Sequence, residues 1–124
     1  MIQIGTVLVV SDNSGARKAK CIKVLKKNKT KLGQVGCLIV VSLQEIASGN
    51  QRNLKKGQVY RAVVLETKRA QRRQDGSVYT FQRNTVALLS PQGSPLGTRI
   101  QGAAPFEVRE KKFMRLLALT STTF

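Results

Sequence analysis

The residues of this sequence that could do chemistry are mainly cationic. Its 124 residues include 22 Lys or Arg, 6 Asp or Glu and no His, for a net charge of +16. Lysine and arginine at this density bind phosphate oxygens, in a manner that is largely independent of base sequence and sensitive to salt. The alternative is a solvated surface without a ligand, but self-repulsion would then lower stability for no purpose. The charge therefore predicts a polyanionic partner, either nucleic acid or an anionic membrane surface.

The cations occur in three blocks, mostly in expected loops or at strand ends. Arg17 to Lys31 holds eight, Arg52 to Arg83 holds nine and Arg99 to Arg115 holds five. Residues beside a turn or in a loop can reach a phosphate without disturbing a core. We predict that the RNA-binding residues are Arg17, Lys18, Lys23, Lys55, Lys56, Lys68, Arg69, Arg72 and Arg73.

The remaining polar residues predict neither catalysis nor a metal site. The lack of His excludes histidine-dependent triads and the common zinc sites. The acidic residues are isolated or lie in turns, and Glu107 and Glu110 are interpreted as capping or pairing groups of a helix. Gly33 and Gly36 form a short turn without the Lys and Ser or Thr of a phosphate-binding loop. We therefore expect no enzyme activity, no cofactor and no metal.

The two cysteines, Cys21 and Cys37, do not form a C-x-x-C pair. A free cysteine is usually a small buried hydrophobic residue, which is our prediction here, with a disulfide or redox role as the alternative. This use of cysteine favours a reducing compartment. The chain has no apolar run of about 18 residues, and its start lacks the pattern of a secretory signal.

The elements that must position these side chains are predicted to be short strands within one domain. Apolar runs between turn signals predict strands over 6–10, 21–25, 37–43, 58–67, 78–81 and 86–89. The run 37–43 is interpreted as buried on both faces. In 58–67, Val63 and Leu65 share one face while Ala62 and Val64 share the other. Short helices are expected after Pro105 and over 113–119, so the pattern indicates a small barrel or sandwich with a helical end.

The aromatic residues indicate which kind of nucleic acid is bound. There are six, with no Trp. Tyr79 and Phe81 have the same parity on a strand and could stack bases, but Phe81 is expected to lie in the core instead. Few stacking groups disfavour a module that reads single strands and favour binding to the backbone and shape of folded RNA.

Motifs along the whole chain resemble those of universal large-subunit ribosomal protein fourteen. Each motif is weak alone, but their order and spacing together are specific. They are Met1-Ile2-Gln3, Asp12-Asn13-Ser14-Gly15-Ala16, Cys21-Ile22, Val24-Leu25, Lys55-Lys56-Gly57, Ala62-Val63-Val64-Leu65, Asp75-Gly76, Phe81, Asn84, Pro95, Gly97-Thr98-Arg99-Ile100, Gly102, Glu107, Arg109 and Lys112-Phe113-Met114.

The resemblance implies an all-β fold: a small closed five-stranded barrel, similar in shape to OB folds, with a basic β-ribbon and short C-terminal helices. It implies a single domain over 1–124, with the barrel at about 1–102 and a helical segment at about 103–124. It also implies a structural constituent of the large subunit that binds large-subunit rRNA, touches neighbouring ribosomal proteins and helps form a bridge to small-subunit rRNA. Docking of a ribosome silencing factor is implied for the residues that match its site, Thr98, Arg99 and Arg115.

Several positions depart from the family pattern, among them Cys37, Glu66, Gln82 and Ala103 to Phe106. Such drift, with so high a charge, favours an organellar ribosome, in the mitochondrial matrix, over a bacterial cytoplasm. Two other classes stay open at this point: a free-standing OB-type nucleic-acid chaperone or translation factor, and a secreted cationic protein that acts on membranes. Co-sedimentation with large subunits at moderate salt separates all three.

Overall fold

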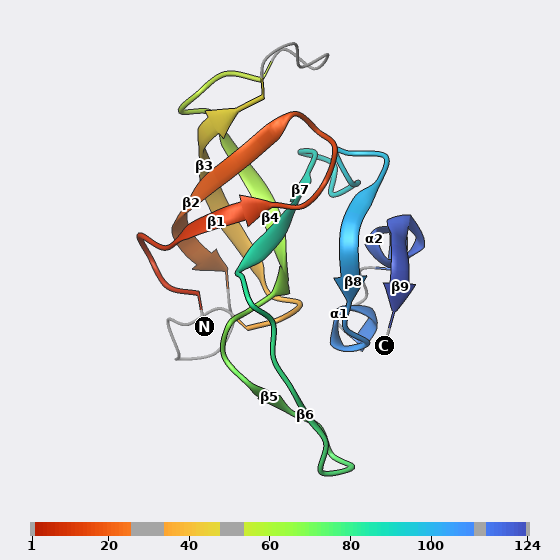
Figure 1. Ribbon diagram of the computed structural model, residues 1–124. Helices are drawn as coiled ribbons and strands as arrows, with labels where there is room; N and C mark the ends of the chain where they lie inside the picture. The colour runs from red at the N-terminus through yellow and green to blue at the C-terminus, as the bar shows by residue number, and fades with distance from the viewer. Residues whose placement is uncertain (1, 26–33, 48–53, 111–113, 124) are drawn as a thin grey trace.

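The computed structural model describes residues 2–25, 34–47, 54–110 and 114–123, and its main body is a closed five-stranded barrel (Figure 1). This confirms the predicted all-β barrel. Neighbouring strands are antiparallel except where the first meets the last, and that parallel pair closes the barrel. In barrel order the strands are β1 (Val7–Val10), β2 (Ala16–Leu25), β3 (Leu38–Ile46), β4 (Val59–Glu66) and β7 (Thr85–Leu89).

The closing seam between β1 and β7 is completed by a turn side chain. β1 has four residues, so its ladder with β7 is short. Beyond it, the carboxylate of Asp12 accepts a hydrogen bond from the backbone N–H of Leu88 at 3.0 Å. The second oxygen of Asp12 accepts from the N–H of Ser14 at 3.2 Å and from its hydroxyl at 2.6 Å. The Asp12 carboxylate therefore holds its own turn in place. It also extends the contact between the two strands beyond the last residue of β1.

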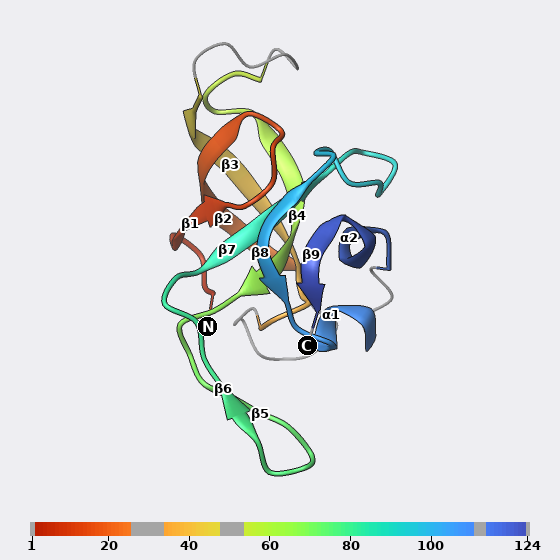
Figure 2. The same ribbon diagram turned by 45° about the vertical axis from the view of Figure 1, so that its right-hand side comes forward.

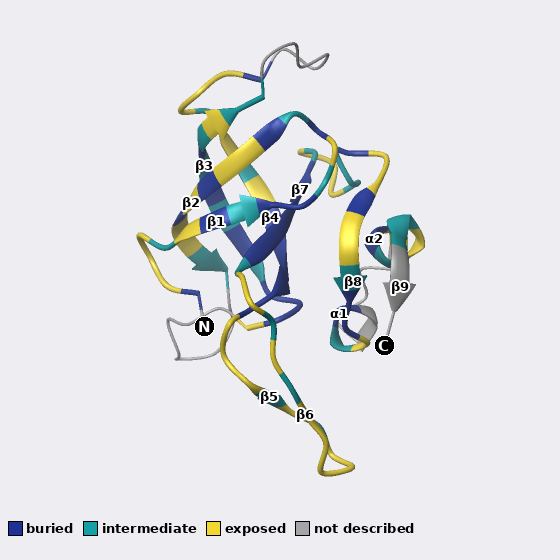
Figure 3. Cartoon of the chain, in the orientation of Figure 1, coloured by how far each residue is buried: buried dark blue, intermediate teal, exposed yellow. Residues whose placement is uncertain are grey.

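Side chains of β4 alternate between two hydrophobic cores, as its pattern predicted. Ala62 and Val64 lie inside the barrel, in one cluster with residues of the other four strands. Val63 and Leu65 point outward into a second cluster with the C-terminal segment. Burial of apolar surface on both sides therefore fixes the C-terminal segment against the outer wall of the barrel (Figures 2 and 3).

The C-terminal segment contains the two predicted helices, a strand whose start was predicted at Thr98 and Arg99, and a further strand that was not predicted. β8 pairs in parallel with β9, and the N–H of Gln101 in β8 donates to the carbonyl of Ser11 at 2.7 Å. β8 thereby connects the barrel to the C-terminal sheet. The extent of β8 and the presence of β9 were not predicted, because the two strands are distant in sequence and Gly102 interrupts the apolar pattern with a φ of 89°. The elements are β8 (Ile100–Ala104), α1 (Glu107–Glu110), α2 (Met114–Leu119) and β9 (Thr120–Thr123).

Two expectations about burial were wrong. The strand β3 is buried on its inner face at Ile39, Val41 and Leu43, but the residues that alternate with them are half-buried, because the C-terminal segment covers only part of this wall. Phe81 is also half-buried rather than in the core, since it belongs to the base of a ribbon that leaves the barrel. There its ring lies edge-on to that of Tyr79, with centroids 5.8 Å apart.

That ribbon is a small hairpin between β4 and β7. Its strands are β5 (Gln71–Arg72) and β6 (Val78–Tyr79), and it extends away from the barrel (Figure 1). At its tip the Asp75 carboxylate accepts hydrogen bonds from the N–H of Ser77 at 3.0 Å and from its hydroxyl at 2.6 Å. Two hydrogen bonds from Ser77 hold the pKa of the Asp75 carboxyl below its usual value, so the carboxylate that accepts them is ionised at neutral pH.

Candidate nucleic-acid interface

Five of the six acidic residues have side chains that the structure describes, and each of the five is engaged within the chain. Asp12 and Asp75 bind backbone and hydroxyl groups of their own turns. The other three form ion pairs, namely Lys18–Glu45 at 3.4 Å, Arg73–Glu107 at 2.9 Å and Arg83–Glu66 at 3.2 Å. Because only 6 acids stand against 22 Lys and Arg, the protein stays strongly positive after these contacts are made.

A larger set of cations is exposed and forms no ion pair within the described ranges. Most of the predicted RNA-binding residues are among them. Cations without an acidic partner are suited to bind phosphates, because no ion pair within the described ranges is lost when they do so. Arg115 is also exposed but donates to Ser94, and the remaining members of the set are Arg17, Lys20, Lys23, Lys55, Lys56, Arg61, Lys68, Arg69, Arg72 and Arg99.

The register of the barrel divides the predicted residues between its two ends. Ala16, beside Arg17 and Lys18, pairs with Ile46 at the end of β3. The turn of Lys55 and Lys56 leads directly into β4, at this same end of the barrel. There the side chain of Lys18 pairs with Glu45, while the remaining cations of this end are exposed.

The ribbon follows the other end of β4, with Lys68, Arg69 and Arg72 exposed. β4 has eight residues, which corresponds to roughly 26 Å at the usual rise per residue. Lys23 lies toward this end on β2, opposite Val40. The structure therefore does not gather the predicted residues into one site but holds two groups of cations at a fixed separation.

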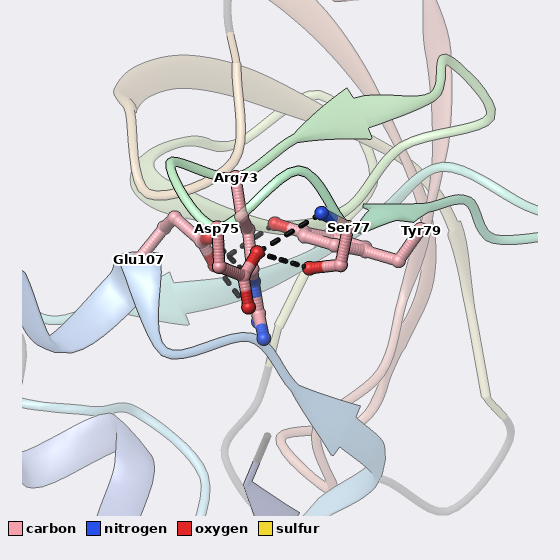
Figure 4. A network of polar contacts seen from close by, with 5 residues as sticks. All are labelled: Arg73, Asp75, Ser77, Tyr79 and Glu107. Carbon is pink, nitrogen blue, oxygen red and sulfur yellow. Dashed lines mark hydrogen bonds and ion pairs between the residues drawn. The ribbon is translucent and has the colours of Figure 1, made fainter.

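Arg73 differs from its neighbours because it has an internal partner (Figure 4). Its Nε donates to one oxygen of Glu107 at 2.9 Å and its Nη2 to the other at 3.3 Å. Tyr79 also donates its hydroxyl to Glu107, at 2.9 Å. The prediction that Arg73 binds RNA stays a prediction, but its guanidinium is already engaged. Glu107 had been identified as a pairing group, whereas nothing in the sequence indicated its partners, which are 34 and 28 residues away.

The electrostatics of this network favour its charged form. Partial burial opposes ionisation of Glu107, but hydrogen bonds from Arg73, its own backbone and Tyr79 outweigh it and leave the pKa of the carboxyl below its usual value. The hydrogen bond to Glu107 is the main cause of a raised pKa for Arg73. Burial, followed by the hydrogen bond to Glu107, raises the pKa of the Tyr79 phenol. At neutral pH the network is therefore a carboxylate, a guanidinium and a neutral phenol.

The three residues predicted to bind a partner lie around one loop that precedes β8. The side-chain oxygen of Asn13 accepts from the N–H of Thr98 at 2.7 Å and from that of Arg99 at 3.1 Å, and its amide donates to the hydroxyl of Thr98 at 2.8 Å. Arg115 in α2 donates to the Ser94 hydroxyl at 3.0 Å. The three residues are thus brought to one loop, although the sequence separates Arg115 from the other two.

Neither a metal nor a thiol site is indicated. Within the described ranges, no cluster of His, Cys, Asp and Glu side chains could hold an ion. Cys21 and Cys37 are buried and free, as predicted, and burial raises the pKa of the Cys21 thiol. Among the described helices, none has both the length and the apolar character needed to cross a membrane.

The fold and the charge distribution define a class, that of small and strongly basic barrel proteins, in which each of the five described acids forms contacts within the chain. The comparison with known families is more specific. Residues 1–124 match the family model described as ribosomal protein L14p/L23e, and the chain belongs to this family of large-subunit ribosomal proteins. A structural role in the large subunit, and a location in the ribosome, follow from that membership.

Proposed function

We propose that the chain organises large-subunit rRNA, through the two groups of cations at the ends of its barrel. The observation that carries the proposal is the set of exposed cations without acidic partners, beside five described acids that are all engaged internally. A closed barrel has no free edges and is rigid, so it can hold basic loops at a constant distance. Each group would neutralise phosphates of RNA segments that otherwise repel one another.

Further parts of the proposal rest on the family alone. They are a position at the subunit interface, contacts with neighbouring large-subunit proteins and a contribution to a bridge with small-subunit rRNA. We also infer a protein without catalysis of its own. From the departures in sequence, we favour an organellar ribosome in the mitochondrial matrix over one in a bacterial cytoplasm.

Co-sedimentation tests the proposal as a whole. In a sucrose gradient of source cells, the chain is expected to migrate with large subunits and to remain there through washes near physiological salt. A stable constituent makes many phosphate contacts at once, so dissociation should require considerably higher salt. Recovery mainly from a free pool, or with DNA, would show that the chain is instead a cycling chaperone or another nucleic-acid-binding protein.

A second surface is proposed to receive the ribosome silencing factor, on Thr98, Arg99 and Arg115. The supporting observation is that Arg115 and the loop before β8 are joined through Ser94, so that a partner could contact all three residues at once. Arg99 is exposed and forms no ion pair with a described acid, and Arg115 is also exposed.

Reversal of charge tests this docking surface. In a pull-down with the cognate silencing factor, the variants Arg99→Glu and Arg115→Glu are each expected to retain less than about a tenth of the binding, because a like charge then faces the group that the arginine contacted. Lys20→Glu, on the exposed side of β2, is the matched control and should bind normally. Normal binding by both folded arginine variants would refute the assignment.

A further inference from the structure

Arg72 and Arg73 are adjacent cations that the structure treats differently. Arg72 pairs with Val78 within the ribbon, and its side chain is exposed. The Arg73 side chain is only 26% exposed and lies against Glu107, the first residue of α1. Because successive residues of an extended chain point to opposite sides, one of these arginines faces solvent while the other faces the body of the protein.

Glu107 receives hydrogen bonds from both sides of the ribbon (Figure 4). Arg73 follows β5 and binds both carboxylate oxygens, in the bidentate geometry that fixes a guanidinium plane. Tyr79 belongs to β6 and donates to one of the same oxygens. The guanidinium carbon of Arg73 also lies 4.7 Å from the centroid of the Tyr79 ring, a cation–π distance. The three side chains thus form one unit that joins both strands to α1.

The ribbon needs such a support to hold one orientation. Its ladder has two residue pairs, Gln71 with Tyr79 and Arg72 with Val78. The tip adds a backbone hydrogen bond from Arg73 to Ser77 at 2.9 Å. At the base, the N–H of Lys68 donates to the side chain of Asn84 at 2.8 Å, and the Thr80 hydroxyl donates to the carbonyl of Lys68 at 2.8 Å. An isolated hairpin of this size is marginally stable in water, and these contacts hold its base but do not support its distal part. The contact with Glu107 does, because α1 is packed through Val108 into the outer core.

We propose that Arg73, Tyr79 and Glu107 form a latch that positions the ribbon, so that Lys68, Arg69 and Arg72 meet the phosphates of folded rRNA. Arg73 is then a positioning residue rather than a phosphate ligand. The inference rests on the proposed RNA-binding function of the ribbon and adds two residues to it, Tyr79 and Glu107. A ribbon held in one orientation presents its cations at fixed positions. The latch should therefore strengthen binding to an RNA with a fixed fold much more than binding to a flexible polyanion.

The test compares two variants of the latch with a control variant at Arg72, the exposed arginine next to Arg73. Tyr79→Phe removes one hydroxyl and no charge, and the double variant Arg73→Ala, Glu107→Ala leaves the net charge unchanged. Arg72→Ala is the matched control that removes an exposed cation. Binding of each full-length protein to deproteinised large-subunit rRNA is measured over a range of salt concentrations, and binding to heparin is measured as the structureless polyanion.

For rRNA, Tyr79→Phe should weaken binding about threefold. The double variant should weaken it about tenfold, because a bidentate pair is lost as well. Both should leave heparin binding unchanged. The log–log salt slope should also stay the same, because an unlatched ribbon still contacts the same phosphates once it is ordered on the RNA and pays only the cost of that ordering. Arg72→Ala removes a contact and should lower the slope by roughly 0.7 to 0.9. If the latch has no role in RNA binding, its variants should lose stability but keep the same ratio of rRNA affinity to heparin affinity as the unmodified protein.

Three results would overturn the inference. A fall of the salt slope in the double variant as large as that in Arg72→Ala would make Arg73 a phosphate ligand. Unchanged rRNA affinity in both latch variants, with a normal Arg72→Ala effect, would remove the latch and leave the proposed function in place. An unchanged slope in Arg72→Ala would show that this side chain does not contact phosphate, and would count against both the ribbon site and its latch.

Discussion

Replacing Lys68, Arg69 and Arg72 together with Ala should weaken binding to large-subunit rRNA about 100-fold at about 0.15 M salt, if each cation contacts one phosphate. All three are exposed and form no ion pair with a described acid. Each lost contact lowers the log–log salt slope by roughly 0.7 to 0.9, so the triple variant should lower it by roughly 2 to 2.7. Filter binding or fluorescence anisotropy at five or more salt concentrations gives both quantities.

A variant that keeps every charge separates the loss of charge from a change in the structure of the ribbon. Lys68→Arg, Arg69→Lys and Arg72→Lys in one protein keep every charge and should retain most of the salt slope. The removed side chains are outside both cores, so the thermal midpoint of the alanine variant should remain close to that of the unmodified protein. An unchanged slope in the folded alanine variant would show that the ribbon faces solvent or protein in place of RNA.

Asp12→Ala should destabilise the fold by about 3 kcal/mol, the largest effect expected of a residue outside the two cores. It leaves the N–H of Leu88 without its acceptor, and an unsatisfied buried donor costs about 1 to 3 kcal/mol. Leu88 is fully buried in β7, so its N–H depends on the Asp12 carboxylate as an acceptor. The hydrogen bonds that shape the Ser14 turn are lost as well. Urea denaturation followed by circular dichroism measures the change.

The chain contains a matched control for this prediction. Asp75 binds Ser77 as Asp12 binds Ser14, through the N–H and the hydroxyl two residues ahead, but on an exposed turn. Asp75→Ala should cost less than about 1 kcal/mol, because water can solvate the released groups. Equal costs for the two variants would mean that Asp12 contributes through its turn alone and not through the seam of the barrel.

Local patterns predicted much of the barrel. Alternation in β4 separated its inner residues from its outer ones, and turn residues marked most strand ends, because both depend on neighbours close in sequence. The same reasoning overestimated burial of β3. A continuous apolar run shows that a strand can be covered on both faces, but how far the cover extends depends on the length and position of the C-terminal segment.

For the functional residues as well, some properties followed from the sequence and others only from the tertiary structure. The sequence alone determined that the chain is strongly basic and carries the motifs of a ribosomal family, and it predicted a single domain with the fold of a small barrel or sandwich, since charge, turn chemistry and motif order are properties of the linear chain. Tertiary structure alone decided that Arg73 is engaged while Arg72 is exposed, that Asp12 completes the seam of the barrel, and that the cations lie at two ends of the barrel. These outcomes depend on partners 28 to 76 residues away, whose approach is set by the closure of the barrel and the packing of its outer core.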